Sequence, residues 1–290
     1  MFVIIGVVVV LGGVLGGFMI EGGPILVLIQ PVEVLIIGGA CIGAILIATP
    51  LKILTILVKR TLGVFGGGYT KGSYIEIMRV MHDIFVKAKR DGYTAIDADV
   101  ALPEKSPVFT KYKGFLANHH AVHFFCDSLR LLVDGAVNAD DLEAMMDTEL
   151  ETHHEEGSKP ASILNKVGDS LPGLGIVAAV LGIVITMQAI DGPPEEIGHK
   201  VAVALVGTFI GILASYGIVQ PLAQNMEHAA DAESKYLACI KAGLVAFARG
   251  AAPIVAVEFA RRGIFSYDRP TNMEMETACK GLPGGVGASH

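Results

Sequence analysis

Four long apolar runs constrain the fold of this chain more than any other feature of its sequence. Residues 2–20, 171–190 and 201–219 carry no charge over 19 or 20 positions. A fourth run, residues 34–49, is uncharged and continues through 51–58 with one lysine, Lys52. A helix needs roughly 20 apolar residues to cross a bilayer, and Lys52 can extend its ammonium group to the headgroups. We therefore expect four transmembrane helices, the first of them retained because no basic segment precedes it, as a secretory signal would require.

The composition agrees with a membrane protein. The 290 residues are 52% hydrophobic and 18% charged, whereas soluble domains are about 25% charged. The net charge of −7 gives no reason to expect nucleic-acid binding. The four cysteines are scattered, which argues against a disulfide framework or a zinc site.

Basic residues indicate which side of the membrane each loop faces. Residues 52–166 hold 14 Lys and Arg, the tail after residue 220 holds seven, and the only other one is Lys200. Because loops rich in Lys and Arg stay in the cytoplasm, both termini and the large loop are expected there.

The chain is therefore predicted to be an all-α, multi-pass protein with a helical cytoplasmic domain. We divide it into residues 1–58 with helices one and two, 59–168 as the cytoplasmic domain, 169–223 with helices three and four, and 224–290 as a cytoplasmic helix and tail. Within 59–168, apolar residues at helical spacing predict helices over 77–90, over 115–133 and from Asn138 onward. Residues 226–258 suggest one long helix with a break near Gly250 and Pro253, and residues from Gly281 on are expected to be disordered.

Several cytoplasmic motifs are weaker than they first look. His119, His120 and His123 include a pair at a spacing that metal ligands use, but no HExxH motif accompanies them, and a solvated or packed histidine face is favoured. Residues 140–156 hold eight Asp and Glu without a basic residue, which is typical of a solvated face. The glycines at 66–68 lack the lysine spacing of a phosphate loop. We expect no catalytic residues, no metal ligands and no cofactor.

The membrane helices carry small residues on one face and no ionisable group at their centre. Helix three places Gly175, Ala179, Gly182 and Thr186 on one side, and helix four places Ala204, Thr208, Gly211 and Ser215 likewise. Such faces mark helix contacts in lipid, either within the chain or with a second subunit. Ion paths normally need an ionisable group, and Glu21 and Glu33 lie only at the outer ends of helices one and two. If the chain conducts ions, another subunit docked on the small-residue face is expected to supply the carboxylate.

Several segments together resemble one known family. Residues 167–180 read VGDSLPGLGIVAAV, residues 206–217 read VGTFIGILASYG and are followed by Pro221, and residues 256–262 read AVEFARR. These segments, with Gln30-Pro31, Glu33 and residues 135–151, resemble the MotA family of flagellar stator subunits over essentially the whole chain. The resemblance implies a pentamer in the bacterial inner membrane around a MotB dimer, whose transmembrane aspartate carries the ion. Ion flow would turn the pentamer against the rotor protein FliG.

The resemblance also implies roles for individual residues. Pro172 and Pro221 occupy the family's two proline positions, and Thr208 matches a threonine on the ion path, with Thr186 a further hydroxyl there. Ala179 stands where sodium-driven relatives carry a hydroxyl, so protons are expected rather than sodium. The rotor-contact charges fall on Lys89 or Arg90 and on Asp97, an aspartate where relatives often have glutamate.

Two alternatives remain. An ExbB or TolQ relative would transmit force without a flagellum, but those proteins have a single membrane helix before the large loop, whereas this chain has two. A membrane metalloenzyme would use His119, His120 and His123.

Overall fold

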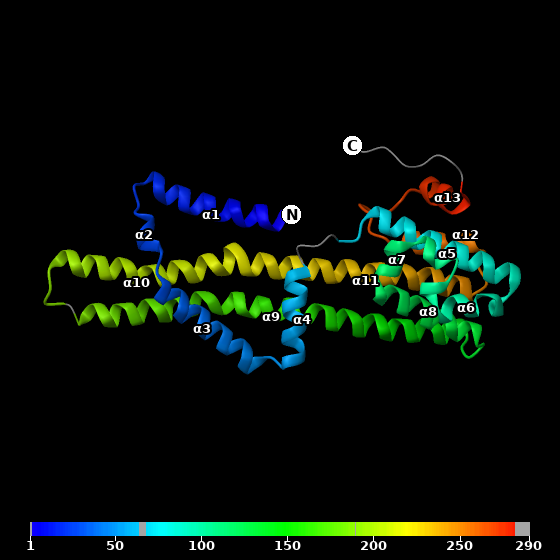
Figure 1. The fold of residues 1–290 in the computed structure, drawn as a ribbon, viewed down its shortest axis with the longest axis horizontal. Helices are drawn as coiled ribbons and strands as arrows, with labels where there is room; N and C mark the ends of the chain where they lie inside the picture. The colour runs from blue at the N-terminus through cyan, green and yellow to red at the C-terminus, as the bar shows by residue number, and fades with distance from the viewer. Residues whose placement is uncertain (1, 64–67, 189, 282–290) are drawn as a thin grey trace. The chain divides into compact units, whose positions relative to one another are not determined.

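The computed structural model describes residues 2–63, 68–188 and 190–281, and every regular element in these ranges is a helix. The chain forms two compact units: unit 1 comprises Met1–Gly67 and Glu156–Ala229, and unit 2 comprises Gly68–Glu155 and Ala230–His290. Four helical segments are long and apolar enough to cross a membrane: Phe2–Ile20, Ile25–Ala48, Ala139–Met187 and Pro194–Ala248. The predicted all-α class with four membrane-length helices is confirmed (Figure 1).

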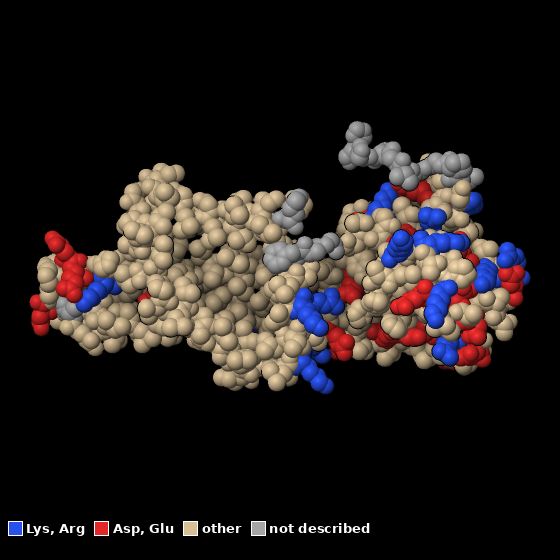
Figure 2. All heavy atoms as spheres, viewed as in Figure 1, with Lys and Arg blue, Asp and Glu red and all other residues tan. Residues whose placement is uncertain are grey.

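Unit 1 holds the apolar helices. They are α1 (Phe2–Ile20), α2 (Ile25–Leu28), α3 (Pro31–Ala48), α4 (Leu51–Gly63), the C-terminal part of α9 (Ala139–Met187), α10 (Pro194–Ala214), the π-helix η4 (Ser215–Val219) and the start of α11 (Gln220–Ala248). Charged side chains are sparse over the visible face of these helices and dense over unit 2 (Figure 2). The expected separation of apolar and charged segments is therefore visible on the surface.

The predicted continuation of the second membrane helix through residues 51–58 is wrong. Helix α3 ends at Ala48, and Thr49 has φ −126° and ψ 124°, the extended conformation that a residue before proline prefers. Pro50 thus separates α3 from α4. In unit 1, α4 packs Leu57 against Ala161 and Met226.

The predicted start of helix three at Asp169 is also wrong. Helix α9 is continuous over 49 residues and contains both Pro160 and Pro172. A proline removes only one helical hydrogen bond of its own, and the surrounding turns continue. Helix α9 begins at Ala139. Asn138 caps this start as predicted, because its Oδ1 accepts from the backbone N–H of Asp140 and Asp141 at 2.9 and 2.8 Å.

Unit 2 packs its helices around an aromatic and aliphatic core. Its further elements are α5 (Lys71–Asp91), η1 (Tyr93–Ile96), α6 (Asp97–Ala101), η2 (Pro103–Lys105), η3 (Phe109–Lys111), α7 (Lys113–Ala117), α8 (His119–Val133), α12 (Pro253–Arg262) and α13 (Asn272–Lys280). The predicted stripe of α5 is buried, and Phe85 stacks on Phe247 of α11 with ring centroids 4.2 Å apart. Such stacking adds to the free energy of burial.

Two predicted helix boundaries in unit 2 have different outcomes. The helix expected over 115–133 is interrupted at Asn118, whose side chain caps α8 by accepting from the Ala121 N–H at 3.2 Å. The break near Gly250 is confirmed, because Gly250 adopts φ +91° between α11 and α12, a conformation that favours glycine. Two expectations concern residues that the structure largely leaves undescribed. Disorder is expected from Gly281 onward, and all of these residues except Gly281 lie outside the described part of the chain. The glycines at 66–68 also lie outside it, except for Gly68.

Candidate ion path and helix joint

The small residues of α9 and α10 pack against each other. A Cβ on Gly175 would lie 2.8 Å from the carbonyl oxygen of Gly207, and one on Gly182 would lie 2.7 Å from the Cβ of Ala204. A Cβ on Gly211 would lie 2.6 Å from the carbonyl oxygen of Leu171. Small residues permit this close approach. The expectation that a second subunit docks on this face is therefore wrong for these glycines, because the surface is used within the chain.

Glu33 brings a carboxylate into the same contact. It lies in the first turn of α3, only 6% of the residue is exposed, and its Oε2 has no hydrogen-bond partner among the described residues. A Cβ on Gly207 would lie 2.7 Å from this Oε2, and a Cβ on Gly182 would lie 3.8 Å from Oε1. The carboxylate thus lies against both α9 and α10. Its place at a helix end could be predicted, but its burial could not.

The three residues predicted for the ion path lie close to this contact. Thr186 is buried, and its hydroxyl donates to the carbonyl oxygen of Gly182 at 2.8 Å. Ala179 and Thr208 are half-buried. The backbone nitrogen of Ala179 would lie 3.3 Å from a Cβ on Gly207, which is the residue before Thr208. The path residues are themselves neutral, and Glu33 brings a carboxylate to the glycines beside them, Gly182 and Gly207.

Pro172 leaves a backbone acceptor that another helix satisfies. Proline has no N–H, so the carbonyl of Gly168, four residues earlier on α9, lacks its helical donor. The hydroxyl of Ser215, which is fully buried, donates to this carbonyl at 2.6 Å. The sequence shows both residues, but the pairing depends on the packing of two distant helices.

A second hydrogen bond lies beside the first. The Gln220 side-chain Nε2 donates to Asp169 Oδ1 at 2.8 Å, so Asp169 binds the first residue of α11. Pro221 follows directly, and the π-helix η4 precedes it. Such π segments are frequent at functional sites. We call Gly168, Asp169, Pro172, Ser215 and Gln220 the helix joint.

Outside the small-residue contact, α9 exposes a large apolar surface. The exposed apolar residues near its C-terminal end are Ile176, Val177, Val180, Leu181, Ile183, Val184, Ile185 and Met187. This surface exceeds what a water-soluble helix would leave uncovered. It is suited to lipid or to another apolar helix.

The charges predicted for rotor contact lie on the surface of unit 2. Lys89 and Arg90 are exposed in the last turn of α5, and Asp97 is exposed at the start of α6, joined to α5 by Gly92 and η1. Arg90 forms two hydrogen bonds with Asp91, at 2.8 and 2.7 Å.

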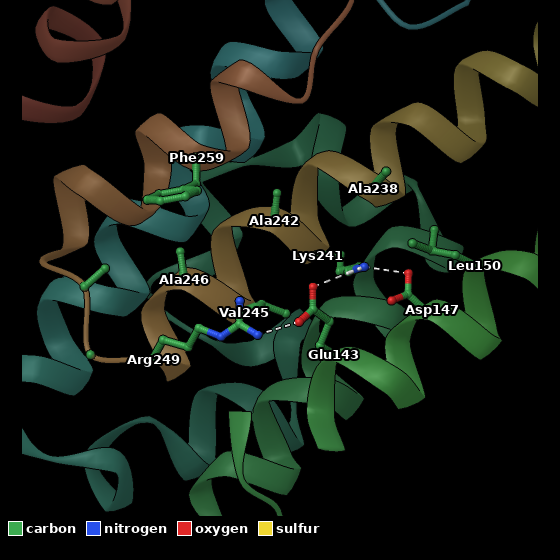
Figure 3. Close-up of a pocket in the computed structure, with 12 residues that line it drawn as sticks. Glu143, Asp147, Leu150, Ala238, Lys241, Ala242, Val245, Ala246, Arg249 and Phe259 are labelled. Carbon is green, nitrogen blue, oxygen red and sulfur yellow. Dashed lines mark hydrogen bonds and ion pairs between the residues drawn. The ribbon is translucent and has the colours of Figure 1, made fainter. Parts of the chain in front are cut away.

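A pocket of about 650 Å³ in unit 2 carries paired charges. Lys241 of α11 contacts Asp147 at 2.5 Å and Glu143 at 3.7 Å, and Arg249 contacts Glu143 at 2.6 Å (Figure 3). These carboxylates lie on the solvated face expected for residues 140–156, and they also join α9 to α11. The basic partners lie far along the sequence and could not be assigned from it.

Comparison with known proteins gives consistent matches. Residues 4–92 match the family described as Motility protein A N-terminal, and residues 117–238 match the MotA/TolQ/ExbB proton channel family. Motility protein A of Salmonella typhimurium and that of Escherichia coli are each 38% identical over 283 residues, covering 95% of this chain and 94% of theirs. The fold matches the structure of C. jejuni MotAB with a TM-score of 0.77 at 22% identity, covering 93% of this chain and 98% of that one.

Proposed function

This chain belongs to the motility protein A family, and from that membership we propose that it is a stator subunit of a bacterial flagellar motor. Its task is to convert ion flow across the inner membrane into torque. The family consists of channel and motility proteins, which agrees with the expectation that the chain is not an enzyme. The observation that carries the proposal is the 38% identity to motility protein A over 95% of the chain.

The proposed topology places both termini and unit 2 in the cytoplasm. The distribution of Lys and Arg supports it, because the segments that flank the membrane-length helices on the other side contain only Lys200.

The proposed partners are further copies of this chain, as a pentamer, and a MotB-type companion. The C. jejuni protein of the same fold was solved as MotAB. The exposed apolar surface of α9 supports such an assembly, because an inserted apolar helix would cover it. The companion would supply the transmembrane aspartate that α9 and α10 do not offer.

The proposed ion is the proton, and the proposed path includes Thr208, Thr186 and Glu33. Alanine at position 179 offers no oxygen ligand for sodium beyond its backbone. A buried carboxylate is a group that can take up and release protons, and that of Glu33 lies against Gly182, one turn before Thr186. We assign to Glu33 the transfer of protons between the outer side and the companion's acid.

The proposed coupling element is the helix joint with Pro221. Pro172 frees the Gly168 carbonyl, and Ser215 donates to it, so the hydrogen bond that proline removes from α9 is replaced by one from another helix. An arrangement of this kind can shift between two states without losing a full helical turn. The rotor contact is proposed on Lys89 or Arg90 and on Asp97, where opposite charges on FliG would steer docking.

The test expresses this chain with its MotB-type companion in a strain that lacks its own motility protein A, and records the rotation of tethered cells. We expect rotation, and we expect the charge reversals Arg90→Glu and Asp97→Lys to slow it at unchanged protein level. The exposed Lys113→Glu on α7 is the control. Absence of rotation, combined with rescue of a strain lacking its TolQ-class protein, would overturn the stator assignment.

A further inference from the structure

Three potential metal ligands from three helices of unit 2 converge on one point. They are His120 in the first turn of α8, His153 of α9 and Glu233 of α11, and one ligand atom from each lies within 4.8 Å of the other two. His153 Nε2 is 3.5 Å from Glu233 Oε1. The rings of His120 and His153 meet at 76°, with centroids 5.3 Å apart.

This geometry is close to that of a tetrahedral zinc site. Zinc binds imidazole nitrogen at about 2.1 Å, so each ring centroid lies about 3.2 Å from the ion and two rings at the tetrahedral angle lie about 5.2 Å apart. The same angle separates two ligand atoms by about 3.4 Å. The ring separation and the His153–Glu233 distance match these values, and a ligand atom of His120 lies within 4.8 Å of those of the other two residues.

The environment of His153 supports a ligand there. The side chains of His153 and Glu233 are 18% and 10% exposed, whereas His120 lies at the surface. A site with one exposed ligand and two held by packing is open to an ion arriving from solvent.

We propose that His120, His153 and Glu233 bind a divalent transition-metal ion of the zinc type, which fastens α8 to α9 and α11. The site does not rest on the proposed motor function. It differs from the histidine pair that the sequence suggests, because His119 and His123 are not part of it, and it departs from the expectation that the chain has no metal ligands.

The test measures Zn²⁺ binding to the full-length protein in detergent, purified without a histidine tag, by competition with a chelator. We expect one ion per chain. We also expect His120→Ala and Glu233→Gln each to weaken Zn²⁺ binding at least about 10-fold, because even the loss of a residue that only hydrogen-bonds to a metal ligand weakens metal binding by about that factor. His119→Ala, which removes the neighbouring exposed histidine, is the matched control.

Two further measurements separate ligation from folding. Zn²⁺ should raise the melting temperature of the wild type and of His119→Ala but not of His120→Ala, because a ligand stabilises the state that binds it. Co²⁺ in place of Zn²⁺ should give the intense visible absorption of a four-coordinate ion in the wild type and in His119→Ala, but not in His120→Ala. Equal Zn²⁺ affinity in the wild type, His120→Ala and Glu233→Gln would overturn the proposal.

Discussion

The hydroxyl of Ser215 donates a 2.6 Å hydrogen bond to the carbonyl of Gly168, the acceptor that Pro172 leaves without a helical donor. Both groups are buried, so the bond replaces a lost backbone bond where water cannot. Proline and serine at these positions therefore act together, although they lie on different helices.

The first prediction tests this pairing with a double-mutant cycle. Ser215→Ala leaves the buried carbonyl unpaired, which should cost about 1–3 kcal/mol and lower the melting temperature of the detergent-solubilised protein. Pro172→Ala restores a helical N–H to the same carbonyl, so Ser215→Ala should lower the melting temperature less in that background. The exposed Ser170→Ala is the control. Equal decreases in both backgrounds would show that the two residues are independent.

The second prediction concerns torque. Pro172→Ala should still assemble with the companion, because the contact between α9 and α10 is unchanged, but it should generate little torque because the joint becomes an ordinary helix. Co-purification measures assembly, and the rotation of tethered cells under load measures torque. Normal rotation would remove the coupling role from Pro172.

The third prediction concerns the space that Glu33 occupies. Gly207→Ala places a methyl group where the Glu33 carboxylate lies, and overpacking of this kind costs about 1–3 kcal/mol. Both the melting temperature and the swimming speed should fall. Gly198→Ala, on the same helix with open space around it, should leave both unchanged. Equal behaviour of the two variants would contradict the packing described for Gly207.

The fourth prediction separates the charge of Glu33 from its shape. Glu33→Gln keeps the size of the side chain but cannot bind and release a proton, so swimming speed should fall severalfold at unchanged protein level. Glu33→Asp should restore part of the speed. If Glu33→Gln swims as fast as the wild type, Glu33 has only a packing role.

The fifth prediction is a pH dependence in unit 2. Hydrogen bonds from Arg261 and, secondarily, Arg262 lower the pKa of Glu258 from its ordinary value of 4.5 to about 2. A carboxyl with a depressed pKa stabilises the fold above its ordinary pKa and loses that contribution as pH falls toward the folded value. Glu258→Gln should therefore lower the melting temperature at pH 7, and the difference from the wild type should shrink between about pH 4.5 and pH 2. Glu104→Gln, an exposed carboxylate of η2, should show neither effect.

Local patterns made much of the fold predictable. The buried stripe of α5 follows from its helical spacing, and the start of α9 follows from the capping side chain of Asn138. The errors concern helix boundaries near prolines, where the sequence alone does not show whether the helix ends. Pro50 separates α3 from α4, whereas α9 continues through Pro172, where Ser215 donates to the carbonyl that this proline leaves free.

The site was less predictable for a related reason. Its sequence positions could be assigned by resemblance, but contacts between distant segments decide what each side chain does. The sequence places Glu33 at a helix end, and it places His120 on a histidine face that is either solvated or packed. The burial of Glu33 against Gly207, and the approach of His120 to His153, emerge only when the helices are packed.

Proton uptake into vesicles tests the central claim most directly. This chain is reconstituted in sodium-free buffer alone, with its MotB-type companion, and with a companion whose transmembrane aspartate is changed to asparagine. Proton flux under an applied gradient is expected only with the unaltered companion, because α9 and α10 place no acid at the centre of the path. Flux through vesicles that contain this chain alone would contradict the account.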